Sequence, residues 1–151
     1  MELQWVTDGS PARWDDDKER VIRAPKAAVF PSLASVAPGS ALAGDWWRVT
    51  DGGRTVGYAW MDVTWGDAEV LLAVDPSTQR HGVGTFALDR LDREAGRRGV
   101  RYLYNVVPAA HPEPAALASW LERRGFVSAD HTDAAEPAGR GQLLRRQVRA
   151  R

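Results

Sequence analysis

A glycine-bearing segment is the part of this sequence best suited to bind a charged ligand. Residues 79–85 read Gln-Arg-His-Gly-Val-Gly-Thr, so that Gln79, Gly82 and Gly84 form the pattern Q-x-x-G-x-G. Glycine lets a backbone turn sharply and approach a ligand closely. An apolar run precedes the segment and helical periodicity follows it, and the first N–H groups of a helix are unpaired and favour anions. The pattern therefore predicts a site for a phosphate-bearing cofactor.

Composition excludes several other kinds of chemistry. The 151 residues include no cysteine, which rules out disulfides, thiolate catalysis and cysteine-ligated metals. The three histidines form no cluster, so we expect no metal site. Lysine plus arginine and aspartate plus glutamate both number 20. The resulting net charge of zero gives no support to nucleic acid or an anionic membrane as the main partner.

The length fits one domain with a hydrophobic core, and we expect residues 1–151 to form a single domain. No apolar run reaches the roughly 18 residues that a membrane-spanning helix needs. The N-terminus lacks a basic segment followed by an apolar one, so no secretory signal is expected. A cytoplasmic location is the default expectation.

Strand signals dominate the first half of the chain. The expected strands are Glu2–Thr7, Asp45–Thr50, Thr55–Thr64 and Ala68–Val74. Asp51-Gly-Gly53 is a strong hairpin turn, so the last three strands should form an antiparallel meander. The apolar run Val70–Val74 indicates a strand buried on both faces. The charged segment Asp15–Arg23 is compatible with a helix.

Helical periodicity begins at the glycine segment. Val83, Ala87, Leu91 and Ala95 recur at helical spacing, and Gly99 is a plausible cap. The remaining expected elements are a strand over Arg101–Val107, a helix over about Ala115–Arg124, and strands over Phe126–Ala129 and Gly141–Val148. The crossover from Ala68 to Val107 requires two parallel strands. We therefore expect an α/β (α+β) fold: a mixed, mostly antiparallel sheet of about seven strands with helices on both faces.

This order of elements resembles the GNAT superfamily of acetyl-CoA-dependent N-acetyltransferases. The resemblance covers nearly the whole chain and is clearest from Ala68 to Phe126. Its second motif is Trp120-Leu-Glu-Arg-Arg-Gly-Phe126, which is similar to the ending of the fourth helix in that family. A Rossmann dinucleotide site is the competing interpretation, but its glycine loop would follow the first strand and not a meander.

The resemblance implies acetyl-CoA as cofactor and assigns residues to it. The pyrophosphate-binding segment of the family corresponds to Gln79, Arg80, His81, Gly82, Val83, Gly84 and Thr85. The fourth and fifth strands would splay apart, and the pantetheine arm would lie along Leu72, Ala73 and Val74. The N–H of Val74 is a candidate to polarise the thioester carbonyl. Asn105 either hydrogen-bonds to the pantetheine or substrate, or occupies a satisfied core position.

Acetyl transfer needs a neutral amine, so a base must remove the proton of an ammonium group. Glu69 is the best candidate, since the run Ala68-Glu-Val70 resembles the strand that supplies the glutamate base in the histone-acetyltransferase branch. The alternative is a surface glutamate paired with an arginine. Leu121 stands where many family members carry a tyrosine as general acid. Tyr104 and His111 are candidate substitutes.

The acceptor would lie near the tryptophans and a carboxylate of the meander. Trp46 and Trp47 are adjacent, so in a strand they would face opposite sides. Trp47, Trp60 and Asp62 are the substrate-binding candidates, because an aromatic wall with a carboxylate suits a cationic amine. The sequence thus predicts an N-acyltransferase that acts on a primary amine of a small molecule or peptide.

Two questions stay open on the sequence alone. The replacement of the usual tyrosine by Leu121 favours the alternative of a non-catalytic acyl-CoA-binding or interaction protein on the same fold. The acceptor, the acyl chain and the oligomeric state, with a homodimer among the alternatives, are not specified by any motif.

Overall fold

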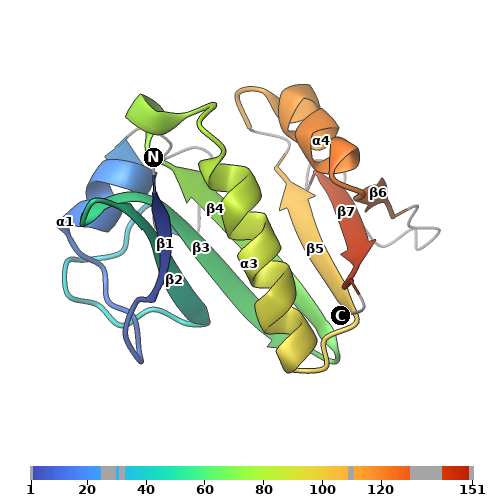
Figure 1. Ribbon diagram of the computed structural model, residues 1–151, viewed down its shortest axis with the longest axis horizontal. Coiled ribbons are helices and arrows are strands. Elements are labelled where there is room, and N and C mark those ends of the chain that lie inside the picture. The colour runs from blue at the N-terminus through green and yellow to red at the C-terminus, as the bar shows by residue number, and fades with distance from the viewer. Residues whose placement is uncertain (1, 25–29, 31–32, 109–110, 130–140, 150–151) are drawn as a thin grey trace.

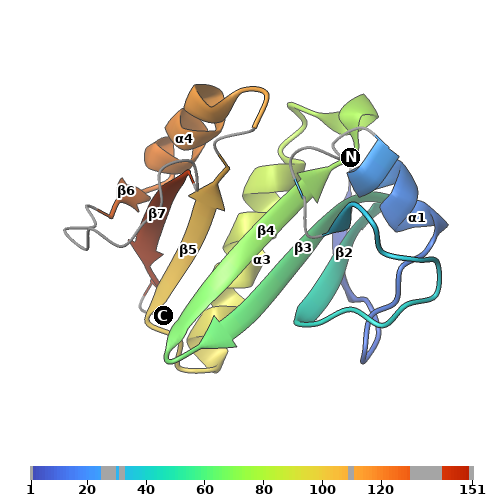
Figure 2. The ribbon, with the colours of Figure 1, turned by 180° about the vertical axis from the view of Figure 1, so that it is seen from behind.

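A single twisted sheet organises the protein. The computed structural model describes residues 2–24, 30, 33–108, 111–129 and 141–149. Within these ranges, seven strands follow the order β1-β2-β3-β4-β5-β7-β6 across the sheet (Figures 1 and 2). They are β1 Leu3–Thr7, β2 Asp45–Asp51, β3 Arg54–Thr64, β4 Asp67–Val74, β5 Tyr102–Val107, β6 Val127–Ser128 and β7 Gln142–Gln147. The predicted mixed sheet is confirmed, since β4 and β5 are parallel and the other neighbours are antiparallel.

Helices lie on both faces of the sheet, as the sequence predicts (Figures 1 and 2). The two longer helices, α3 Val83–Arg97 and α4 Pro114–Arg123, contribute buried residues to one cluster. The short helix α1 Asp16–Lys18 continues into a π-helical turn, Glu19–Arg23, whose buried residues belong to a cluster on the opposite face. No helix in the described ranges is long and apolar enough to cross a membrane.

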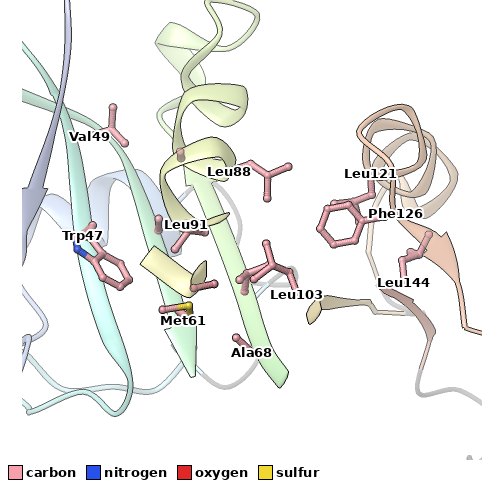
Figure 3. Close-up of a cluster of buried hydrophobic side chains, with 14 of the residues drawn as sticks. Trp47, Val49, Met61, Ala68, Leu88, Leu91, Leu103, Leu121, Phe126 and Leu144 are labelled. Atoms are coloured by element: carbon pink, nitrogen blue, oxygen red, sulfur yellow. The ribbon is translucent and has the colours of Figure 1, made fainter. Parts of the chain in front are cut away.

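The larger core fills the space between the sheet and the two longer helices (Figure 3). The predicted apolar stripe of α3 is confirmed, because Val83, Ala87, Leu91 and Ala95 are all buried there. Leu121 of α4 joins the same core (Figure 3). Burial of such a stripe supplies the main driving force for docking a helix on a sheet.

The smaller core lies on the other face, under α1. Trp46 packs there edge-on against Tyr58, with ring centroids 6.2 Å apart. Its neighbour Trp47 belongs instead to the larger core and stacks on Trp5 at 5.3 Å. The two adjacent tryptophans therefore face opposite sides of β2, as strand alternation predicts.

The strands β4 and β5 pair for a short distance and then separate. Their register comprises Asp67–Tyr102, Ala68–Leu103 and Glu69–Tyr104 within the described residues. Beyond these pairs the two strands diverge towards their C-terminal ends (Figures 1 and 2). The predicted splay of the fourth and fifth strands is therefore present.

The splay corrects one detail of the sequence analysis. The run Val70–Val74 was expected to be buried on both faces, but Leu71, Leu72 and Val74 are only half-buried. A strand loses cover on the side where its neighbour leaves it. The run therefore packs in the cores on both faces, through Val70 and Ala73, and its half-buried residues also line an opening.

Candidate functional site

A groove of about 990 Å³ occupies the opening between β4 and β5 and continues between α3 and α4. Its size is typical of sites for small molecules and cofactors. The groove brings together most of the predicted cofactor residues. These are Leu72, Val74, Gln79, Arg80, Gly82, Val83, Gly84, Thr85 and Asn105.

The start of α3 forms the polar end of this groove. Gly82 is the N-cap, with φ of +82°, and supplies no side chain to cap the first turn. Arg80 also adopts a positive φ of +69°, which is uncommon for a residue with a Cβ. The first-turn N–H groups and the positive end of the helix dipole favour an anion at this point.

Gly84 has a packing role that its place in the motif does not reveal. A Cβ at this position would lie 3.2 Å from Cζ2 of Trp120, on the facing helix α4. This glycine therefore lets the first turn of α3 approach α4 closely. The same residue serves the close approach of a ligand and the close approach of two helices.

Two predicted cofactor residues do not line the groove. The side chain of His81 is exposed, and the residue lies outside the groove wall. Ala73 is 4% exposed and packs in the smaller core on the α1 face. Strand alternation places Ala73 on the opposite face of β4 from Leu72 and Val74.

Asn105 lies where the two strands begin to separate. Its Nδ2 donates to the carbonyl oxygen of Val70 at 2.6 Å, and the residue also lines the groove. The amide thus bridges β5 and β4 one position beyond their last backbone pair, Glu69–Tyr104. It forms part of the wall and has a partner within the protein.

Three polar residues meet on the sheet face at the same point. Glu69 is the register partner of Asp62 on β3 and of Tyr104 on β5. Neighbouring strands place register partners on the same face. The next residues of β4, Val70 and Leu71, line the groove. Glu69, Asp62 and Tyr104 are themselves not among the residues that line the groove, and Glu69 directly precedes its first lining residue on β4.

The surroundings of Glu69 make it a better base than an ordinary glutamate. Burial raises the pKa of its carboxyl group, and the negative charge of Asp62 raises it further. The pKa of the Tyr104 hydroxyl is also raised, mainly by burial and then by the charge of Glu69. At neutral pH this tyrosine keeps its proton and can act as a donor.

The substrate-binding candidates are divided between different places. Asp62 is exposed beside Glu69, and Trp60 is half-buried with its Nε1 donating to the Ala43 carbonyl oxygen at 2.8 Å. Trp47 is 4% exposed and lies in the α3-side core. The structure brings Trp60 and Asp62 to the face of Glu69, and it does not bring Trp47 there.

Arg124 is one of the groove residues that the sequence analysis missed. Arg124 follows α4, lines the groove and reaches across to Thr85 at the start of α3. Its guanidinium carbon lies 3.8 Å from the ring centroid of Trp120. The i, i+4 spacing of Trp120 and Arg124 is the sequence signal that could have indicated the stacking of Arg124 on Trp120.

Metal ligands do not gather anywhere in the described part of the chain. No group of three or more histidine, cysteine, aspartate or glutamate side chains within those residues could hold a metal ion. His111 lines the groove, and its Nδ1 accepts a hydrogen bond from the N–H of Glu113 at 2.9 Å.

Comparison with known families agrees with this arrangement. The family model for the acetyltransferase (GNAT) domain matches residues 43–128, which is more than half of the chain. The protein therefore belongs to the GNAT acetyltransferase family. No match was found among curated proteins.

Solved structures with the same fold include two N-acetyltransferases and an N-acetylglutamate synthase. The ribosomal-protein-S18-alanine N-acetyltransferase of Escherichia coli has a TM-score of 0.58 and 22% identity over 99% of this chain and 96% of that chain. The PaiA N-acetyltransferase of Thermoplasma acidophilum, solved with coenzyme A, has a TM-score of 0.57 and 14% identity over 68% and 59%.

The third is N-acetylglutamate synthase of Neisseria gonorrhoeae, complexed with coenzyme A and N-acetyl-glutamate. It has a TM-score of 0.67 and 17% identity over 99% of this chain but 36% of its own length. At these identities the likeness is one of fold.

Proposed function

We propose that this protein transfers an acetyl group from acetyl-CoA to a primary amine of a small molecule or peptide, with Glu69 as general base. The observation that carries the proposal is the position of Glu69 at the last β4–β5 pair, next to Val70, which lines the groove. A half-buried carboxylate with a raised pKa beside a cleft is suited to proton transfer.

The groove fits coenzyme A on three grounds. Its polar end is an uncapped helix start, which suits the pyrophosphate. Its middle is the β4 edge at Leu72 and Val74, which lies beyond the last β4–β5 pair and suits the pantetheine arm. Two relatives in fold, the PaiA enzyme and N-acetylglutamate synthase, were solved with coenzyme A. The thioester supplies an acetyl group activated for attack.

Proton movements follow from the polar residues on the sheet face. Asp62 would attract the ammonium form of the acceptor, and Glu69 would take its proton, leaving a lone pair for attack. The departing thiolate needs a proton, and Tyr104 is our candidate donor because it is the register partner of Glu69 and its hydroxyl is protonated at neutral pH. Leu121 is 3% exposed in the core and has no proton to give.

The substitution Glu69→Gln tests this role. It keeps the shape of the side chain and removes its basicity, so we expect turnover to fall by about 100-fold or more. Coenzyme A affinity, measured by calorimetry, should stay within about twofold. Glu122→Gln is the matched control, because Glu122 is exposed and lies on α4, not on the strand next to the groove. Full turnover by Glu69→Gln would reject Glu69 as the base.

The alternative function is a non-catalytic acyl-CoA-binding protein. Leu121 favours it, since this residue replaces the tyrosine expected from the family pattern and is buried in the core. Such a protein would bind coenzyme A and show no acceptor-dependent turnover. A single domain over residues 1–151, a cytoplasmic location and a homodimer remain predictions.

A further inference from the structure

Arg124 makes an unusual set of contacts at the polar end of the groove. Its Nε and Nη2 both donate to the hydroxyl oxygen of Thr85, at 3.2 and 2.9 Å. Its Nη1 donates to the carbonyl oxygen of Trp120 at 3.0 Å. The guanidinium also lies over the Trp120 ring. One side chain thereby joins the end of α4 to the first turn of α3.

Two N–H groups of the guanidinium thus donate to one uncharged oxygen, the hydroxyl of Thr85. Adjacent N–H groups of a guanidinium form a planar fork that matches two oxygens of a phosphate or carboxylate. A threonine hydroxyl supplies only one oxygen. The fork therefore has the geometry for a stronger acceptor than the one it contacts in the protein alone.

We propose that Arg124 binds a phosphate group of coenzyme A. The inference rests on the proposed function and adds a residue to its cofactor site. Thr85 and Gly82 lie on the same groove wall at the start of α3, so a phosphate there would meet both the helix end and the guanidinium. Stacking on Trp120 fixes the plane of the fork before the ligand arrives.

The electrostatics of the groove support this assignment. Burial lowers the pKa of the Arg124 guanidinium, and the nearby positive charge of Arg123 lowers it further. Both effects disfavour the cation when no anion is present, and a phosphate would offset them. Among the described residues, the other charged side chains on the groove wall are those of Arg80 and Glu113.

Calorimetric titration with coenzyme A and with 3′-dephospho-coenzyme A tests the proposal. For Arg124→Gln we expect coenzyme A to bind at least tenfold more weakly than to the unaltered protein. Arg124→Lys keeps the charge but loses the fork, so its loss should be intermediate. Arg123→Gln is the matched control, since it removes the same charge one residue away, from an exposed side chain outside the groove wall.

The two ligands identify which phosphate is bound. If Arg124→Gln weakens both ligands equally, the contact is to the pyrophosphate. If the difference between variant and unaltered protein disappears with 3′-dephospho-coenzyme A, the contact is to the 3′-phosphate. Thermal unfolding without ligand checks that each variant is folded, and Arg124→Lys carries the test if Arg124→Gln is not.

Two results distinguish a failure of the Arg124 proposal from a failure of the proposed function. Coenzyme A binding by Arg124→Gln that matches Arg123→Gln would overturn the role of Arg124 and leave the proposed function intact. Absence of coenzyme A binding by the unaltered protein would instead reject the proposed cofactor site itself.

Discussion

Glu69 shows how a single residue can acquire function from its neighbours. Its side chain is half-buried, and its cross-strand partner Asp62 carries the same negative charge. Both conditions penalise the ionised carboxylate and so raise its pKa. A base that holds a proton more readily is a better partner for an ammonium ion near neutral pH.

The raised pKa predicts a pH-dependent stability difference. The folded state binds a proton at Glu69 more tightly than the unfolded state does. The stability contributed by this group is therefore fully present below the unfolded value near 4.5 and is lost as pH rises through the folded value. Glu69→Gln removes the titration, so its stability relative to the unaltered protein should increase from pH 4.5 to pH 8.

Urea denaturation of both proteins at the two pH values measures this difference. Because the side chain is only half-buried, we expect a modest effect in the stated direction. A difference that stays constant with pH, or that shrinks towards pH 8, would show that the Glu69 pKa is not raised.

Sequence reasoning reached the residues of the glycine segment because their contacts are local. Gly82 and Thr85 belong to one turn and the helix it begins. The contact between Arg124 and Thr85 could not be predicted from local patterns, because the two residues are 39 positions apart in the sequence. The face on which Trp47 would lie also depended on strand packing, which alternation alone leaves open between core and groove.

At the scale of elements, the approach of α3 to the sheet decides the geometry of the cofactor groove. Gly57 of β3 makes this approach possible. A Cβ there would lie 2.9 Å from Cγ1 of Val83, the first residue of α3, and 3.0 Å from the backbone oxygen of Ala73. The oxygen belongs to the neighbouring strand β4 and cannot move aside cheaply.

Two glycine substitutions test this packing. Gly57→Ala should destabilise the protein by about 1–3 kcal/mol, because it overpacks the contact between α3 and β3. Gly96→Ala is the matched control within α3: its Cβ would lie 3.7 Å from Cγ1 of Val148, an ordinary contact. Alanine there should stabilise the helix by about 0.5–1 kcal/mol. Chemical denaturation of both variants decides the matter, and equal effects would contradict the close approach at Gly57.

The element pattern was predictable where periodicity is strong. The helical spacing from Val83 to Ala95 and the turn Asp51-Gly-Gly53 each identify their elements from a few neighbouring residues. The half-burial of β4 was not predictable, because an apolar run such as Val70–Val74 reads the same whether it meets a closed core or an open groove.

At the scale of the whole molecule, the site lies at a short strand pairing inside the sheet. Three residue pairs connect β4 to β5 within the described ranges, so other contacts must hold the C-terminal strands in place. Asp92 of α3 and Arg146 of β7 form a buried pair with Nη2 and Oδ2 2.7 Å apart. Arg146 also donates to the carbonyl oxygen of Arg124 at 2.8 Å.

These contacts tie α3, which packs on β3 and β4, to β7 and the end of α4 on the β5 side of the opening. Breaking a buried ion pair by removal of one partner is strongly unfavourable, so such a pair keeps its elements in one arrangement. These contacts thereby set the relative positions of elements that border the groove, and ligand sites are usually largely pre-formed.

The most direct test of the central claim is acetyl-CoA consumption, read as release of free thiol, across a panel of amines. The panel should include amino acids, polyamines, aminoglycosides and lysine peptides. Because the chain has no cysteine, thiol in the assay comes from coenzyme A and not from the protein. Our account predicts acceptor-dependent release with at least one of these amines. No release with any of them, by protein that binds coenzyme A in calorimetry, would contradict the transferase and support the acyl-CoA-binding alternative.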